Sequence, residues 1–127
     1  MQLKEFNIKI DLKKDTKNMD VTVVQHDTKT NVFNVKILDF GKLINIPADQ
    51  NIKAVFQDRT GKIVIQEDDI SNNNNIIRIM LNDNVMNLHD GDIKMEIILE
   101  TFKDEKIDKR LTTFTFQFKM IKGIYGK

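Results

Sequence analysis

The chain has 127 residues, and its 20 Lys and Arg nearly balance its 19 Asp and Glu, giving a formal net charge of +1. A chain of this length fits one domain with a single core. The balance of charge argues against a nucleic-acid-binding protein, because such proteins use a basic excess to neutralise phosphates. The sequence has no cysteine, which excludes disulfides and thiolate metal sites and suits a protein made in a reducing cytoplasm.

Alternating apolar and polar residues predict strands along the whole chain. The N-terminus leads directly into the first strand, and no apolar run reaches the length of a membrane span, so we expect neither a signal peptide nor a membrane anchor. The predicted strands are residues 5–12, 20–25, 31–39, 52–57, 62–66, 76–81, 92–102 and 110–120. Short strands without helices between them predict an all-β, antiparallel sandwich, with a closed barrel as the alternative.

Turn-forming residues fill the gaps between these strands. The segment from Asp58 to Gly61 predicts a tight hairpin in which Gly61 takes a positive φ. Residues 71–75, one serine and four asparagines, predict an exposed connection. Asp83 is expected to cap a single helical turn. The mixed charges of residues 103–110 predict a solvated hairpin loop.

The final strand has the most regular pattern, with Phe114, Phe116, Phe118 and Met120 alternating with polar residues. Strict alternation places these four side chains on one face, which we expect to line the core. Other phenylalanines at predicted inward positions are also interpreted as core residues rather than as a ligand site. These are Phe33, Phe56 and Phe102.

Few side chains in this sequence could carry out catalysis or bind a metal. Ser71 is the only serine, and no histidine lies near it in the sequence to activate it. The two histidines occur as His26-Asp27 and His89-Asp90, both in predicted turns where polar residues are expected in any case. Two histidines without cysteine do not complete a zinc site. We therefore predict no enzyme activity, no cofactor and no metal.

Three segments carry a resemblance to a known family. Residues 24–35 contain a Gln-x-Asp turn that leads into an alternating strand, residues 88–99 place Gly91 before a long strand, and residues 110–118 end in a Thr-x-Phe-x-Phe strand. Together with the opening strand, these segments resemble the N-terminal domain of the phage baseplate upper protein family. His26 stands where this family often has glycine.

The resemblance implies an immunoglobulin-like β-sandwich, and the predicted strands number about seven to eight within residues 1–120. It also implies a structural, non-enzymatic docking module of a tailed-phage baseplate that links receptor-binding proteins to the baseplate core. The expected partners are other baseplate or distal tail proteins and receptor-binding proteins, in a symmetric oligomeric assembly without nucleic acid or membrane. The expected location is the virion, after synthesis in the host cytoplasm. Family members usually continue into a stem, so the chain is either an excised domain or a short version with a different attachment.

Residues 121–127 are expected to leave the sandwich as a C-terminal connector or tail. They break the alternation and contain two glycines, yet they keep Ile124 and Tyr125. We interpret Ile124 and Tyr125 as candidate partner-binding residues, because tyrosine is enriched at interfaces. A frayed tail is the alternative.

A second functional hypothesis is an extracellular carbohydrate-binding or adhesive β-sandwich module. The fold class and the exposed Asn- and Asp-rich loops motivate it. The sequence has no Trp and a single Tyr, whereas sugar-binding faces usually need an aromatic platform. Binding to a glycan array or to cell walls would distinguish such a module from a baseplate component.

Overall fold

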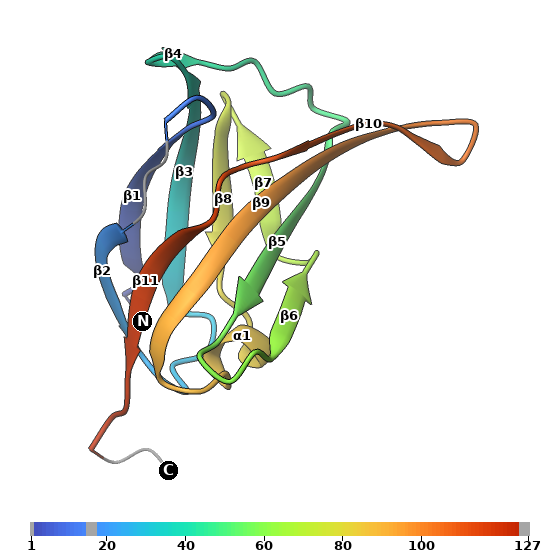
Figure 1. The fold of residues 1–127 in the computed structure, drawn as a ribbon. Coiled ribbons are helices and arrows are strands. Elements are labelled where there is room, and N and C mark those ends of the chain that lie inside the picture. Colours follow the sequence, from blue (N-terminus) through green and yellow to red (C-terminus); the bar gives the residue numbers. More distant parts are fainter. Residues whose placement is uncertain (1, 15–17, 125–127) are drawn as a thin grey trace.

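The computed structural model describes residues 2–14 and 18–124. Its strands form two sheets that pack face to face as a sandwich (Figure 1). Sheet A contains β1 (Lys4–Asp11), β3 (Asn31–Asp39), β4 (Lys42–Leu43), β7 (Ile70–Asn73) and β8 (Ile76–Met80). Sheet B contains β2 (Asn18–Val24), β5 (Asn51–Gln57), β6 (Ile63–Gln66), β9 (Gly91–Lys103), β10 (Lys106–Thr112) and β11 (Phe116–Ile121). The prediction of a β-sandwich rather than a single closed barrel is confirmed.

Both sheets are mixed, so the prediction of a purely antiparallel sandwich is wrong. β1 pairs with β3 in parallel and β2 pairs with β11 in parallel, because β1 and β2 lie in different sheets instead of forming a hairpin. The described residues contain eleven strands rather than seven or eight. The short strands β4 and β7 carry no clear alternation, and a break divides the predicted final strand into β10 and β11. The immunoglobulin-like strand order stays a prediction.

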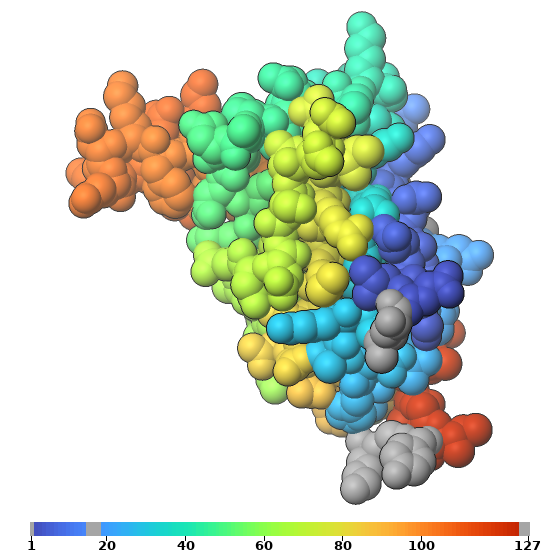
Figure 2. All heavy atoms as spheres, turned by 180° about the vertical axis from the view of Figure 1, so that it is seen from behind, coloured from blue at the N-terminus to red at the C-terminus, as the bar shows by residue number. Residues whose placement is uncertain are grey.

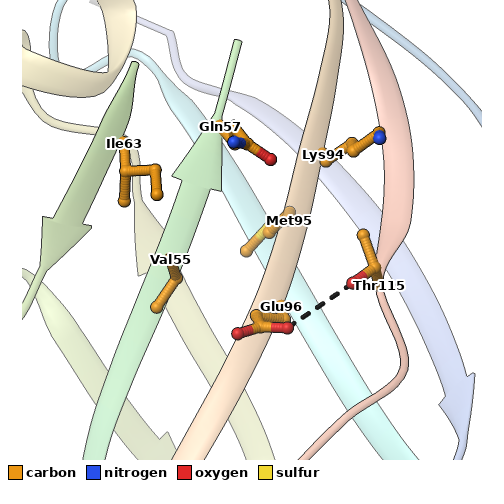
Figure 3. Close-up of a pocket in the computed structure, with 7 residues that line it drawn as sticks. All are labelled: Val55, Gln57, Ile63, Lys94, Met95, Glu96 and Thr115. Atoms are coloured by element: carbon orange, nitrogen blue, oxygen red, sulfur yellow. Dashed lines mark hydrogen bonds between the residues drawn. The ribbon is translucent and has the colours of Figure 1, made fainter. Parts of the chain in front are cut away.

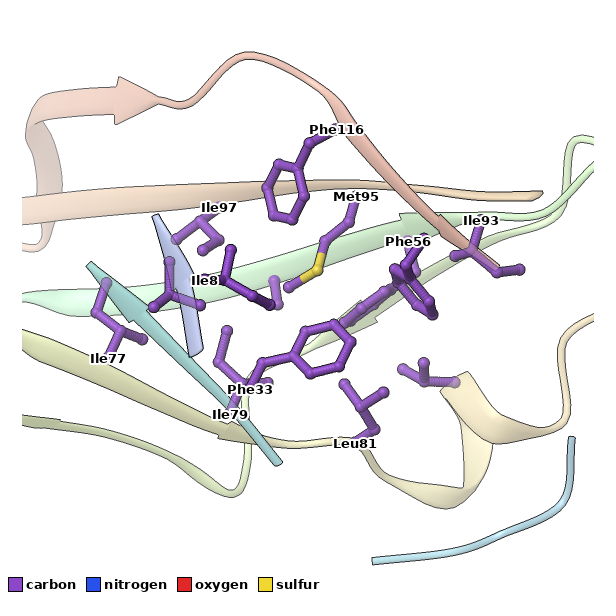
Figure 4. Packing of buried hydrophobic residues seen from close by; sticks show 14 of the residues in the cluster. Ile8, Phe33, Phe56, Ile77, Ile79, Leu81, Ile93, Met95, Ile97 and Phe116 are labelled. Atoms are coloured by element: carbon purple, nitrogen blue, oxygen red, sulfur yellow. The ribbon is translucent and has the colours of Figure 1, made fainter. Parts of the chain in front are cut away.

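The core lies between the sheets and consists of inward-facing residues of both (Figure 4). Phe33 on β3 meets Phe118 on β11 across the sandwich, with ring centroids 5.1 Å apart in an edge-to-face arrangement. Phe118 also contacts Phe56 on β5, with centroids 6.3 Å apart. These rings and that of Phe116 are buried, so the alternation in the sequence identified this part of the core correctly.

Phe114 does not lie on the predicted inward face, because its side chain is 47% exposed. It lies in the break between β10 and β11, where Thr113 is buried instead. The Thr113 N–H donates to the Ile97 carbonyl, and the Ile97 N–H donates to the Thr113 hydroxyl. Since the hydroxyl substitutes for a backbone acceptor, the strand shifts its alternation here and resumes it at Phe116.

The short helix α1 (Asp83–Met86) covers one end of the sandwich (Figure 1). Its N-cap is Asn82 rather than the predicted Asp83, and Asn82 Oδ1 accepts a hydrogen bond from the Val85 N–H at 3.1 Å. Val85 and Met86 are buried against the core. Among the described residues, no helix is long and apolar enough to cross a membrane.

The predicted connection over residues 71–75 is shorter than expected, although Ser71, Asn73 and Asn74 are exposed. Residues 70–73 pair with β8, and Asn74 and Asn75, with φ values of 53° and 65°, form the turn that follows. Asparagine tolerates a positive φ better than most residues. Asn75 Oδ1 accepts a hydrogen bond from the Ile46 N–H at 2.8 Å, which ties this turn to the loop between β4 and β5.

The buried Asp58 carboxylate joins the β5–β6 hairpin to the segment before β9. It accepts hydrogen bonds from the N–H groups of Thr60, Lys62 and His89 and from the Thr60 hydroxyl. Burial raises the pKa of Asp58, but these hydrogen bonds outweigh that effect and lower the pKa to about 2. Gly61 in this hairpin has a φ of 91°, as predicted.

Candidate docking surfaces

The β9–β10 hairpin extends beyond the sandwich as a two-stranded arm, which we define as residues 100–110 (Figure 1, Figure 2). Asp104 and Glu105, with φ values of 53° and 64°, form the tight turn at its tip. Phe102 and Ile107 lie opposite each other behind this turn and are 53% and 44% exposed. The predicted exposure of residues 103–110 is confirmed, but residues 106–110 belong to strand β10 rather than to a loop. The assignment of Phe102 to the core is wrong, because β9 continues past the end of the sandwich.

A buried carboxylate holds the root of the arm. Glu100 on β9 accepts a hydrogen bond from Arg110 Nε at 2.8 Å, and its other oxygen lies 3.1 Å from Lys53 Nζ on β5. Hydrogen bonds from Arg110 and Lys53 lower the pKa of Glu100, although burial opposes them. Losing either cation would leave the buried carboxylate with less compensation. The network therefore ties the root of the arm to β5 of the sandwich.

β10 forms the outer edge of the arm, and it pairs only with β9 in the described part of the chain. All of its residues are exposed. Its register with β9 shifts between Ile107 and Lys109, which leaves Asp108 as a bulge. A bulge interrupts the row of free backbone groups along an edge and disfavours the addition of another strand. The arm is therefore suited to contact a partner through its side chains.

The outer face of sheet B presents apolar and polar side chains together (Figure 3). Ile63 and Ile65 on the edge strand β6 are 57% and 59% exposed. Val55 on β5 lies opposite Ile65, and Glu96 on β9 lies opposite Val55, so this row changes from apolar to acidic across the sheet. A mixed surface of this kind is compatible with a protein–protein contact.

The C-terminal end of the sandwich exposes a third set of apolar side chains. β11 ends at Ile121, whose carbonyl accepts a hydrogen bond from the Gln25 N–H at 2.8 Å. The chain then leaves at the end of the molecule opposite the arm (Figure 1). Ile124 is fully exposed, and Tyr125 lies outside the described residues. The binding of a partner by Ile124 and Tyr125 stays a prediction.

The two histidines lie in connections between strands, as predicted. His26 has a φ of 71°, a left-handed conformation that favours the glycine expected here from the family resemblance. Its N–H donates to the Met86 carbonyl at 2.9 Å, and its Nδ1 lies 2.7 Å from Asn87 Oδ1. The His89 N–H donates to the Asp58 carboxylate at 3.0 Å. Both residues thus have structural contacts that explain their positions.

Within residues 2–14 and 18–124, no group of three or more His, Asp or Glu side chains is placed to hold a metal ion. The features that stand out are instead exposed apolar side chains on the arm, on the outer face of sheet B and at the C-terminal end. Surfaces of this kind can bind other proteins.

No family model matches the sequence, and no curated protein matches it. Among solved structures, the chain is similar to the N-terminal domain of phage TP901-1 ORF48, the baseplate upper protein. The TM-score is 0.75 at 13% sequence identity, and the match covers 93% of this chain and 98% of that chain. The predicted resemblance to the baseplate upper protein domain is confirmed at the level of the fold.

Proposed function

We propose that this chain is a structural, non-enzymatic docking module of a tailed-phage baseplate, located in the virion, and that it links receptor-binding proteins to the baseplate core. The observation that carries this proposal is the fold shared with the N-terminal domain of ORF48 over nearly the whole of both chains. In this role the chain contributes contacts and no chemistry.

The positions of its exposed apolar side chains support a linking role. The arm carries Phe102 and Ile107 at one end of the molecule, and the C-terminal end exposes Ile121 and Ile124 at the other (Figure 1). A module with contact regions at opposite ends can hold two partners at once. In this proposal the arm contacts the ring-forming distal tail or baseplate core proteins.

The C-terminal segment supplies the second contact. Residues 1–120 act as the sandwich domain, and residues 121–127 act as a connector that orders against the receptor-binding side of the assembly. Ile124 and Tyr125 are the proposed partner-binding residues, since Ile124 is fully exposed on a chain that has already left the sandwich.

Size-exclusion chromatography of the purified chain with candidate baseplate core and receptor-binding proteins tests this function. The wild type is expected to co-elute with a ring-forming protein. The F102S/I107S variant is expected to stop co-eluting with the baseplate core protein. The I124S/Y125S variant is expected to stop co-eluting with the receptor-binding protein. F40S is the matched control, because Phe40 is 70% exposed but lies in the β3–β4 turn, outside both contact regions.

Failure of the wild type to associate with any ring component or receptor-binding protein would contradict the proposal. If the Phe40 control and the arm variant lose co-elution with the core partner to the same extent, the contact is not made by the arm. Binding to a glycan array, without binding to tail proteins, would favour the carbohydrate-binding alternative.

A further inference from the structure

The proposed function gives no role to the apolar side chains on the outer face of sheet B. Val55, Ile63 and Ile65 group there on two neighbouring strands, and we call them the β6 patch (Figure 3). More than half of each isoleucine is exposed. Single exposed apolar residues are common on protein surfaces, but a group of three that a neighbouring apolar surface extends can form part of an interface.

The β6 patch and the arm lie on one continuous face, because β9 runs from one to the other (Figure 1). Side chains two residues apart along a strand point to the same side. The outer side of β9 therefore carries Glu96, Ile98, Glu100 and Phe102. Glu96 lies opposite Val55 at the patch, and Phe102 lies opposite Ile107 on the arm. The bulge at Asp108 lies on β10 and leaves this alternation intact.

Between Ile98 and Phe102, the charges of this face are already paired. Ile98 is half-buried and lies opposite Lys53. The buried Glu100 carboxylate is held by Lys53 at 3.1 Å and by Arg110 at 2.6 Å. Breaking such a pair is costly, but covering an intact pair leaves neither charge without a partner. A partner can therefore lie over this stretch and reach both the patch and the arm.

The face has a different character in the direction of the C-terminal end. Asp92, Lys94 and Lys119 are exposed there, and none of the three has an ion pair within residues 2–14 and 18–124. Burying a charge without a partner is costly. The β6 patch therefore continues towards the arm rather than towards Ile124, which favours the partner of the arm as its occupant.

The size of the arm points to the same occupant. Beyond Glu100, β9 adds only residues 101–103, so one face of the arm is roughly 10 Å long at about 3.4 Å per residue. Stable interfaces bury about 800 Å² on each partner. The face from Lys94 to Phe102 is roughly 27 Å long and extends across β9, β5 and β6. It offers several times the area of the arm face.

We propose that the baseplate core protein that contacts the arm also covers the β6 patch, so that one partner lies along the outer face of sheet B from β6 to Phe102 and Ile107. This inference rests on the proposed function, which gives the arm to that protein. The matching surface of the partner carries two apolar patches roughly 20 Å apart, the spacing of Glu96 and Phe102 along β9. A polar strip lies between them, with a hydrogen-bond donor facing Glu96.

Thiol labelling tests whether this surface is covered, because the chain has no cysteine of its own. Ile65→Cys places a thiol in the β6 patch, and Leu43→Cys is the matched control, at a 44% exposed position in sheet A. Each variant is labelled with a maleimide, alone and with the core protein that co-elutes with the wild type, and mass spectrometry follows the label on this chain. The core protein is expected to slow labelling at least about tenfold at position 65 and to leave position 43 unchanged.

Binding of the I63T/I65T variant gives a second measurement. Threonine keeps the β-branched shape that suits a strand, and thermal unfolding checks that the variant folds. It is expected to bind the core protein at least about tenfold more weakly than the wild type, since less apolar surface is buried, and to bind the receptor-binding protein equally well. L43T is the control and is expected to bind both proteins like the wild type.

The outcomes separate this inference from the proposed function. A core protein that needs Phe102 and Ile107, but leaves labelling at position 65 and binding of I63T/I65T unchanged, would overturn the inference while the proposed function stands. Protection of position 65 by the receptor-binding protein instead would also overturn it. If no core protein binds the wild type, the proposed function fails and the inference fails with it.

Discussion

The Glu100 carboxylate on β9 lies 2.6 Å from Arg110 Nη2 on β10, and this pair marks the point at which the arm leaves the sandwich. Lys53 on β5 approaches the same carboxylate from the other side, at 3.1 Å. One buried acid thus joins three neighbouring strands. We expect this network to hold the arm in place, because the side chains beyond it, residues 102–109, are exposed and pack against no facing sheet.

Replacing Arg110 with Met is expected to loosen the arm, because Glu100 then keeps fewer partners. Hydrogen exchange should become faster in residues 101–108 and stay unchanged in β5. Glu67→Gln is the control, since Glu67 contributes only an exposed contact to Lys53, at 3.4 Å. Unchanged exchange in the arm of the Arg110 variant would show that the network does not hold it.

Replacing Phe116 with Ala is expected to lower the free energy of unfolding by about 3–5 kcal/mol, because a fully buried ring is lost and a cavity remains. Phe114→Ala is the matched control two residues away and should change it by less than roughly 0.5 kcal/mol, because that ring is about half exposed. Urea unfolding of both variants makes the comparison. Similar decreases in the free energy of unfolding for both variants would mean that the break in alternation does not lie at Thr113.

The Asp58 carboxyl predicts a dependence of stability on pH. Its pKa falls from an ordinary value of 3.8 to about 2 on folding, so its contribution is present above about pH 4 and is lost as the pH falls towards 2. Asp58→Asn is therefore expected to lower the free energy of unfolding by roughly 1–3 kcal/mol near neutral pH. Urea unfolding should show this difference shrinking between about pH 4 and pH 2, whereas a constant difference would exclude the carboxylate as its cause.

His26 provides a test of backbone strain. Its φ of 71° is costly for a residue with a Cβ, by roughly 1–2 kcal/mol. His26→Gly and His26→Ala both remove the contact to Asn87, but only glycine relieves the strain. Thermal unfolding is expected to find the glycine variant more stable than the alanine variant by about 1 kcal/mol, after allowance for the flexibility of glycine in the unfolded chain. An alanine variant of equal or higher stability would count against the left-handed conformation.

The alternation of residues was sufficient to predict most of the core. Phe33 and Phe118 lie in strands where apolar residues alternate with polar ones, and both are buried. This alternation indicates which side of a strand faces inward. It carries no information on which strands become neighbours. The parallel pairing of β1 with β3 depends on how distant segments meet, so local patterns predicted an antiparallel arrangement instead.

The candidate surfaces were harder to predict for the same reason. Phe102 has the alternation of a core residue, but whether a second sheet covers it depends on where the sandwich ends. The network around Glu100 requires the register of three strands, which the sequence does not show. His26 is an intermediate case, because the resemblance led us to expect glycine there, but the positive φ of 71° appears only in the structure.

Quantitative mass spectrometry of purified phage particles that carry the gene for this chain tests the central claim most directly. If the chain is a baseplate component, its peptides are expected in the particles at a fixed, whole-number ratio to the ring-forming tail proteins. Peptides found only in the soluble lysate, and absent from particles that contain complete tails, would contradict the account.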